Sequence, residues 1–330
     1  MSTADSRWVL AQAVTHLPAG NVLFIDTGEI ATQIVAQRPD ITPIAFSTSR
    51  EPWVKAPLSM VNGVLLGWSH HKEQVRMMLA MLAEKLPEGT GVWLVGGARS
   101  GIASAARLLD DANWKNVHKL AYGGHAELWH AELAQQAPAR GIEAWQRRIV
   151  QEVAGLELVL VSLPGVFSHG EVDEGTELLL NNMPLLPKGA RVHDFGCGCG
   201  IIATWLKLRQ PDLNISASDI NALAHAAAKA TLKANRITDV NVHVAAGLGP
   251  IDGMFDAIVT NPPFHTGQKI DMGIVDELFK SAQKKLAKGG ALYVVANRFL
   301  AYREAMAQLI GPVKVLAETP AFWVLKATRT

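Results

Sequence analysis

The sequence predicts an α/β fold in which two similar domains follow one another along the chain. Short β-branched runs alternate with helical patterns over residues 20–135 and again over 186–330, which is typical of parallel sheets. The segment 85–95 aligns without gaps on 285–295, and an Ile-Ala-Thr triplet precedes a Pro-Asp pair in both halves. Matches that keep their order favour duplication of one α/β unit over chance recurrence of a strand and a turn.

The hydrophobic pattern places the elements of each domain. In the first half we expect strands at 22–25 and 92–95, with a helix at 74–86 whose apolar residues recur at helical spacing. In the second half we expect strands at 192–195, 215–217, 240–244, 257–260 and 292–296, and helices at 201–209, 222–235 and 276–286. This alternation of strands and helices predicts an α/β fold with a parallel sheet in each half.

The composition fits two packed domains. The chain has 330 residues, 49% of them hydrophobic, and a stretch of linker composition at 135–141. We therefore expect an N-terminal domain over 1–150 and a C-terminal domain over 151–330. No apolar run is long enough for a membrane span, and no basic segment followed by an apolar stretch marks a secretory signal. With only two cysteines, one residue apart, the sequence predicts a reduced, cytoplasmic protein away from membranes.

A glycine-rich loop follows the strand at 192–195 and opens the helix at 201–209. It reads Asp194-Phe195-Gly196-Cys197-Gly198-Cys199-Gly200. Glycines let the backbone approach a ligand closely, and Asp219, at the end of the next strand, can accept the ribose hydroxyls of an adenosine. The part from Gly198 to Ala203 fits the NAD fingerprint, whereas Asp just before the first glycine is typical of class I S-adenosylmethionine (SAM) methyltransferases. The loop alone leaves both cofactors open.

The cysteines of this loop do not indicate a metal site. A single Cys-x-Cys pair without a histidine cluster offers too few ligands for structural zinc. We therefore expect Cys197 and Cys199 to fill space in a tight loop, and His193 to be a hydrogen-bonded core histidine.

The tetrad Asn261-Pro262-Pro263-Phe264 follows the strand at 257–260. An exocyclic amine conjugated to a ring is a poor nucleophile, and an Asn side-chain oxygen with a neighbouring carbonyl can accept its two N–H groups and so orient its lone pair. The prolines stiffen this backbone, and Phe264 offers a ring for a flipped base. The tetrad predicts methyl transfer to a planar amine and removes most of the support for NAD.

A third segment narrows the substrate. It comprises Leu163-Pro164-Gly165-Val166-Phe167-Ser168 and Asp173-Glu174-Gly175-Thr176. Together with the glycine loop and the tetrad, it resembles the ribosomal RNA small subunit methyltransferase C family. The resemblance implies two tandem Rossmann-like class I methyltransferase domains, the first degenerate. It also implies SAM-dependent methylation of a guanosine N2 amine in 16S rRNA, within the 30S subunit or an assembly intermediate. A large-subunit guanine-N2 methyltransferase, an NAD-dependent oxidoreductase and a non-enzymatic RNA-binding factor are the alternatives.

The resemblance also implies roles for single residues. The SAM loop comprises Gly196, Gly198 and Gly200, with Asp194 near the amino-acid end of SAM, Asp219 on the ribose and Ile220 beside the adenine. Phe167 and Ser168 belong to the segment that covers the cofactor, and Asn261, Pro262, Pro263 and Phe264 hold the guanine. The chain departs from the family at Ala245-Ala246-Gly247, where relatives usually carry an Asx that binds the adenine.

The first half has lost these motifs. The loop that corresponds to the glycine loop contains one glycine, Gly28, and the segment that corresponds to Thr260 and the tetrad reads Gly67-Trp68-Ser69-His70-His71. We expect this half to bind no SAM and to support folding or rRNA binding. It has 14 basic and 13 acidic residues, and the second half has 17 of each. Near-neutral halves argue against tight binding through phosphates alone and favour recognition of one shaped RNA site.

Overall fold

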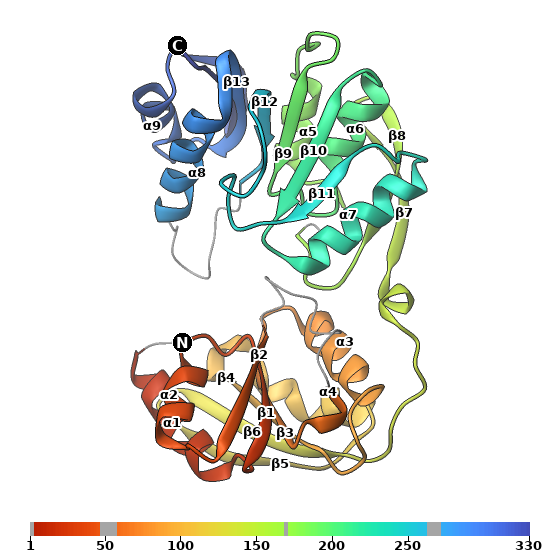
Figure 1. The fold of residues 1–330 in the computed structure, drawn as a ribbon, viewed down its shortest axis with the longest axis vertical. Helices are drawn as coiled ribbons and strands as arrows, with labels where there is room; N and C mark the ends of the chain where they lie inside the picture. Colours follow the sequence, from red (N-terminus) through yellow and green to blue (C-terminus); the bar gives the residue numbers. More distant parts are fainter. Residues whose placement is uncertain (1–2, 47–57, 168–170, 263–271) are drawn as a thin grey trace. The chain divides into compact units, whose positions relative to one another are not determined.

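The structure is a computed structural model that describes residues 3–46, 58–167, 171–262 and 272–330. It divides into two compact units, Met1–Trp145 and Gln146–Thr330 (Figure 1). The division precedes the boundary expected at residue 150 because a hairpin that begins at Arg147 packs on the second unit. The two units are described separately below.

Unit 1 is built on a six-stranded sheet in the order β2-β1-β3-β4-β6-β5. The first four strands are parallel, and β6 and β5 run antiparallel. Its elements are α1 (Thr3–His16), β1 (Gly20–Ile25), α2 (Ile30–Gln37), β2 (Ile41–Phe46), β3 (Gly63–Gly67), α3 (Lys72–Ala83), β4 (Gly91–Gly97), α4 (Ala105–Asp111), β5 (Trp114–Gly123) and β6 (Ala126–Leu133). The elements expected at 22–25, 74–86 and 92–95 are therefore present.

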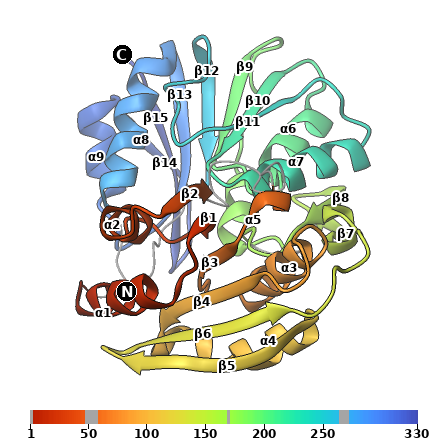
Figure 2. The ribbon, with the colours of Figure 1, turned by 60° about the horizontal axis from the view of Figure 1, so that its bottom comes forward.

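Helices cover both faces of this sheet. On one face α1 and α2 enclose a buried cluster that includes Leu17, Ile34, Phe24, Leu65 and Leu128. On the other face lie α3 and α4, and Figure 2 shows α4 beside the β5–β6 pair. Alternate residues of β1 therefore point to opposite, equally apolar layers, which explains its continuous hydrophobic run.

Unit 2 is built on a seven-stranded sheet in the order β11-β10-β9-β12-β13-β15-β14. Its strands are β9 (Arg191–Phe195), β10 (Asn214–Asp219), β11 (Asn241–Val244), β12 (Phe255–Thr260), β13 (Leu286–Asn297), β14 (Val313–Glu318) and β15 (Phe322–Thr328). Its helices are α5 (Glu174–Asn181), α6 (Ile201–Arg209), α7 (Ala222–Ala234), α8 (Met272–Lys285) and α9 (Tyr302–Leu309). All the elements expected in the second half are present, with boundaries shifted by a few residues.

The two sheets share one topology. In each, four parallel strands lead into an antiparallel pair, and β2, β1, β3, β4, β6 and β5 correspond in order to β10, β9, β12, β13, β15 and β14. The aligned segments 85–95 and 285–295 both lead into the fourth of these strands, and the two Ile-Ala-Thr triplets both lie in the first turn of the helix after the central strand. The predicted pair of tandem α/β domains is confirmed, and the described residues of unit 1 contain no counterpart of β11.

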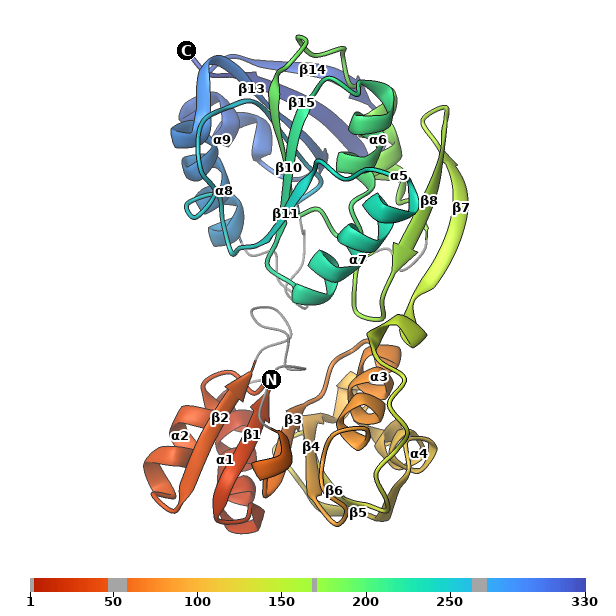
Figure 3. The same cartoon turned by 45° about the vertical axis from the view of Figure 1, so that its right-hand side comes forward.

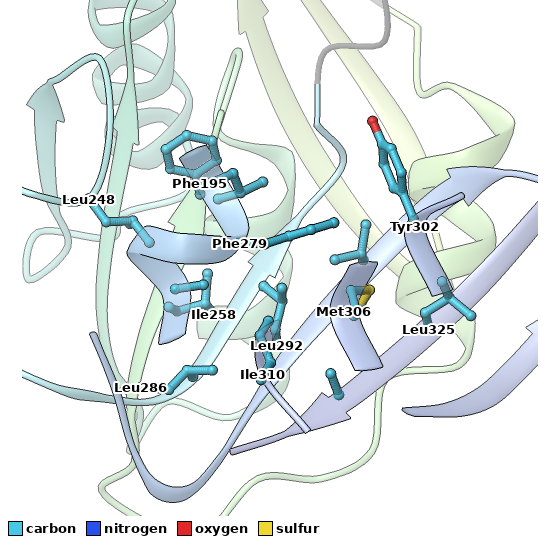
Figure 4. Close-up of a cluster of buried hydrophobic side chains, with 14 of the residues drawn as sticks. Phe195, Leu248, Ile258, Phe279, Leu286, Leu292, Tyr302, Met306, Ile310 and Leu325 are labelled. Atoms are coloured by element: carbon cyan, nitrogen blue, oxygen red, sulfur yellow. The ribbon is translucent and has the colours of Figure 1, made fainter. Parts of the chain in front are cut away.

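The largest apolar layer of unit 2 lies between its sheet and the helices α8 and α9 (Figure 4). Ile258, Leu292 and Leu325 project from three neighbouring strands toward Phe279 of α8 and Met306 of α9. The ring of Phe279 meets that of Tyr302 edge to face, with centroids 5.5 Å apart. This layer packs against β12, and Asn261 follows β12 directly.

A two-stranded hairpin, β7 (Arg147–Val153) and β8 (Leu156–Ser162), extends unit 2 (Figure 3). Side chains of α7 bind the backbone of β8. The Thr231 hydroxyl accepts from Val161 N–H at 2.9 Å and donates to its carbonyl, and the Asn235 amide makes the same pair with Val159. These bonds satisfy polar groups that β8 would otherwise leave unpaired, and they fix the start of the segment that leads to Phe167.

Candidate active site

The glycine loop, Asp219 and Asn261 meet at one edge of the unit 2 sheet. They follow β9, β10 and β12, and β9 is paired in parallel with both of the other strands. In open parallel sheets ligands bind beyond the carboxyl ends of the strands, where helices begin. The structure therefore brings together residues that lie up to 67 positions apart in the sequence.

The glycines of the loop adopt backbone conformations that other residues avoid. Gly196, Gly198 and Gly200 have φ values of 69°, 52° and 82°. A Cβ on Gly200 would lie 3.1 Å from Ala228, so this glycine also permits close packing of α6 against α7. A Cβ on Gly198 would meet no atom within 4 Å. The loop is thus packed tightly at its helical end and open at Gly198, where a ligand can approach the backbone.

Asp219 holds the glycine loop by hydrogen bonds. Its two oxygens accept N–H groups from Gly198 at 2.9 Å and from Asn221 at 2.8 Å. Burial raises the pKa of its carboxyl, and these backbone bonds partly oppose that rise. Each carboxylate oxygen has further acceptor capacity, so Asp219 can still accept ligand hydroxyls.

Asp194 lies beneath the loop and is fully buried. Its Oδ2 accepts the Ala203 N–H at 3.0 Å, whereas Oδ1 has no hydrogen-bond partner among the residues that the structure describes. Burial raises the pKa of Asp194 to about 7, and the nearby Asp219 adds to this effect. A buried acceptor without a partner costs about 1–3 kcal/mol, which a donor brought by a ligand or water would offset.

The cysteines and His193 have structural roles, as expected. Both thiols are free and buried, and burial raises the pKa of Cys199 to about 12. The His193 ring lies between the hydroxyls of Ser216 and Ser218, each 2.8 Å from a ring nitrogen. Burial lowers the pKa of His193 to about 3, so it is neutral and does not supply a proton near pH 7.

The Asn261 side chain has a defined orientation. Its Nδ2 donates to Asp173 Oδ2 at 3.0 Å and to Thr176 Oγ1 at 2.9 Å, while its buried Oδ1 has no partner among the described residues. Asp173 is itself fixed as the N-cap of α5, where its Oδ1 accepts from Gly175 and Thr176. An oriented and unsatisfied carbonyl oxygen therefore lies at the end of β12. Pro262 beside it is buried, and Pro263 and Phe264 lie outside the described residues.

The segment after β8 reaches the same edge of the sheet. Asn221 donates from Nδ2 to the Gly165 carbonyl at 3.2 Å and caps α7 through Oδ1. Phe167 is 66% exposed, and Ile220 is 44% exposed after β10. Such exposed apolar side chains beside an open loop suit a flat hydrophobic ligand. Ser168 lies outside the described residues.

One further feature completes this edge of the sheet. The Ala245 N–H donates to the Asp219 carbonyl at 2.9 Å, which continues the β10–β11 pairing by one residue. Asp173 and Thr176 belong to a sequence motif but had no predicted role, and Asn221 had no predicted role either. A local signal for Asp173 was present, because Asp is a preferred N-cap residue and the apolar run 178–180 follows it.

Unit 1 lacks the corresponding groups. The aligned segments 85–95 and 285–295 match β4 to β13, and the strand pairing then matches β3 to β12 and β1 to β9. In this match Phe24 occupies the position of Asp194, and Gly67 occupies that of Asn261. The next residue, Trp68, lies against Gly96 and donates its indole N–H to the Ser100 carbonyl at 3.1 Å. The described part of unit 1 thus has neither the buried carboxylate nor the amide of the unit 2 site.

Among the described residues no group of three or more histidine, cysteine or acidic residues could hold a metal ion. Within the same ranges, no helix combines the length and the apolar character that a membrane span needs.

Three features of unit 2 define a class I methyltransferase domain. They are the glycine loop after β9, Asp219 at the end of β10 and the Asn-Pro-Pro sequence after β12. The Methyltransferase small domain family matches residues 157–326, and the Methyltransferase small domain N-terminal family matches 41–149. The chain belongs to the ribosomal RNA small subunit methyltransferase C family. Both the predicted fold class and the predicted family are confirmed.

Relatives from several bacteria carry the name Ribosomal RNA small subunit methyltransferase C. The protein of Hahella chejuensis is 38% identical over 78% of this chain and 75% of its own length. That of Pseudomonas aeruginosa is 38% identical over 84% and 82%. A T. thermophilus 16S rRNA N2 methyltransferase, solved with AdoMet and guanosine, has the same fold with a TM-score of 0.83, at 21% identity over 98% of this chain and 92% of its own.

Proposed function

We propose that this chain transfers the methyl group of SAM to the N2 amine of one guanosine in 16S rRNA. One observation carries the proposal: at the end of β12, on the sheet edge that also holds the glycine loop, the Asn261 side-chain oxygen has no hydrogen-bond partner among the described residues. A carbonyl oxygen in that place accepts an N–H, and an aromatic exocyclic amine has two to donate. The membership of the family supports the same reaction.

The chemistry requires orientation more than a strong base. The lone pair of the guanine N2 is delocalised into the ring, so the amine reacts only when its geometry is changed. Two acceptors, Asn261 Oδ1 and the backbone carbonyl beside it at Pro262, hold the two N–H groups and direct the lone pair outward. Fixed alignment of reacting groups can supply much of the rate. The proton is then lost to solvent.

The residues of the site fit SAM. Gly198 leaves open space at the loop, Asp219 has acceptor capacity for ribose hydroxyls, and Ile220 and Phe167 offer exposed apolar surface for the adenine. Gly196 and Gly200 shape the loop, and Asp194 beneath it orders backbone and water around the amino-acid end of SAM. When bound, SAM supplies an electrophilic methyl group. In the same proposal Ser168 continues the cover over the cofactor, and Pro263 and Phe264 hold the flipped base.

Three observations support the choice of substrate. Relatives with up to 38% identity are named for the small-subunit RNA. The T. thermophilus protein with the same fold was solved with guanosine. Each half of this chain is close to neutral, which suits a shaped site in a 30S subunit or an assembly intermediate better than free RNA. We place the enzyme in the cytoplasm, where its two buried, free thiols would remain reduced.

We assign the two domains, 1–150 and 151–330, different roles. The second carries the cofactor and the reaction. The first, with Phe24 and Gly67 in place of the acidic and amide groups, supports folding or binds rRNA. Residues outside the catalytic tetrad would then decide which guanosine is chosen.

The test uses the full-length protein with methyl-tritiated SAM. It is incubated with unmodified 30S subunits, 50S subunits or naked 16S rRNA, and the labelled base is mapped. We expect label on one guanosine N2 of 16S rRNA, most rapidly in assembled subunits. Asn261→Ala should abolish transfer and leave SAM affinity unchanged by calorimetry. Label confined to 50S subunits would indicate a large-subunit enzyme, and NADH binding without SAM binding would indicate an oxidoreductase. Either result refutes the proposal.

A further inference from the structure

The Asn261 amide can be oriented in two ways that differ by a half-turn, and only one is useful. With Oδ1 toward the target, the side chain accepts an amine N–H. With Nδ2 toward the target, the NH₂ of Asn261 would face the N–H groups of the target amine, and no hydrogen bond could form between these donors. Carbon–carbon rotation alone does not choose between them, because the two ends of a carboxamide have similar size. Something in the protein must therefore select the productive orientation.

We infer that Asp173 and Thr176 are positioning residues that lock the Asn261 amide with its oxygen toward the guanine amine. Asp173 Oδ2 lies 3.0 Å from Asn261 Nδ2 and has only lone pairs to offer. If the Asn261 Oδ1 lay in place of its Nδ2, two acceptor oxygens would face each other with no hydrogen between them, which is unfavourable. The inference rests on the proposed function, because it assigns these residues to the same methyl transfer.

Each hydrogen bond among Asp173, Thr176 and Asn261 has one donor and one acceptor. The Thr176 hydroxyl donates to Asp173 Oδ2 at 2.5 Å, so its oxygen is left to accept from Asn261 Nδ2 at 2.9 Å. The second hydrogen of Nδ2 goes to Asp173 Oδ2. Both hydrogens of the amide are thereby used, and Oδ1 is left as an acceptor without a partner among the described residues. The closed cycle has one consistent set of donors, which is the basis of the lock.

The anchor for this lock is the start of α5. Asp173 caps the helix, and its Oδ1 accepts N–H groups from Gly175 at 2.9 Å and Thr176 at 3.2 Å. Gly175 in turn lies against Val295 and Phe322, where a Cβ would come within 3.3 Å and 3.5 Å of their side chains. The carboxylate is therefore held by a helix packed on the sheet, 88 positions from the amide it orients. Its charge also polarises the amide and makes Oδ1 a better acceptor.

The test compares three conservative variants. Asp173→Asn keeps the shape, and when its oxygen caps α5 its NH₂ faces the Asn261 NH₂, two donors together, so the Asn261 amide loses its fixed orientation. We expect kcat to fall about 100-fold, with KM for the 30S subunit and SAM affinity unchanged. Thr176→Val removes one acceptor and should lower kcat, whereas Thr176→Ser should retain it. Glu174→Gln is the matched control, because it removes an exposed carboxylate from the same turn.

Two outcomes would overturn the inference. The first is Asp173→Asn with wild-type kcat. The second is a loss of SAM affinity equal to the loss of kcat, which would make Asp173 part of the cofactor site. The thermal unfolding temperature of each variant shows whether a change in kcat or in SAM affinity is caused by loss of folding.

A second readout does not depend on activity. The side-chain ¹H–¹⁵N signals of Asn261, assigned by their absence in Asn261→Asp, should show slow hydrogen exchange in the wild type. Asp173→Asn should make that exchange fast, and exchange that is equally slow in both would refute the lock. If the wild type fails to methylate any ribosomal substrate, the proposed function fails while this measurement still decides the orientation of the amide.

Discussion

The side chain of Asn221 donates to the backbone carbonyl of Gly165 across 3.2 Å and thereby connects the end of β10 to the segment that carries Phe167. The same side chain caps α7 by accepting the Leu223 N–H at 2.9 Å. Since Asp219 accepts the backbone N–H of Asn221, the loop, the cap and the covering segment form one hydrogen-bonded unit.

The first prediction separates the two bonds of Asn221. Asn221→Ser still caps α7 but is too short to reach Gly165, so stability should change by only a few tenths of a kcal/mol. SAM affinity should fall about five- to tenfold, as expected for one lost hydrogen bond. Asn221→Ala should lose about 1 kcal/mol of stability in addition. Calorimetry and urea unfolding measure the two effects, and a Ser variant with wild-type SAM affinity would contradict the role of the Gly165 bond.

The second prediction compares two glycines with similar backbones. Gly198 and Gly189 have φ values of 52° and 75°, and a Cβ on either would meet no atom within 4 Å. Replacement by Ala should therefore cost each about 1–2 kcal/mol of stability for the left-handed conformation. Only Gly198→Ala should abolish SAM binding, because its methyl group would occupy the open side of the loop. Equal SAM affinity in the two variants would place the cofactor elsewhere.

The third prediction concerns pH. Burial raises the pKa of Asp194 from 3.8 to about 7. Between these values the folded state keeps a proton that the unfolded state has released, so the free energy of unfolding falls as pH rises and levels off above about pH 7. Asp194→Asn lacks this titration. Between pH 5 and pH 8 its stability relative to the wild type should rise by about 3 kcal/mol in urea unfolding. A difference that is the same at both pH values would show that Asp194 titrates normally.

The fourth prediction pairs a core ring with a surface ring. Phe279 is fully buried against Tyr302, so Phe279→Ala should lower the free energy of unfolding by about 4 kcal/mol. Phe167 is mostly exposed, and Phe167→Ala should change stability by less than about 0.5 kcal/mol while weakening SAM binding. Thermal unfolding with and without SAM distinguishes the two. A destabilised Phe167→Ala variant would mean that this ring packs in the core of the fold.

Much of the fold was accessible from the sequence because the relevant signals are local. The helix expected at 201–209 has those bounds in the structure, and the strand at 257–260 is extended by only two residues. The duplicated segments at 85–95 and 285–295 identified the repeat because each contains a complete turn and strand. The β7–β8 hairpin was not predicted, although its two strands are adjacent in the sequence and joined by Ala154-Gly155. Only its attachment to α7 depends on distant residues, Thr231 and Asn235, some 70 positions away.

The sequence by itself determined the class of reaction, because the glycine loop and the Asn-Pro-Pro motif are each contiguous and each demand a particular backbone chemistry. It also determined the two-domain repeat. Only the tertiary structure decided which atom of the Asn261 amide is held by the protein and which is left as an acceptor, because that depends on Asp173 and Thr176, which precede it by 88 and 85 positions. The physical reason is that a hydrogen bond acts over about 3 Å in space, whatever the separation along the chain.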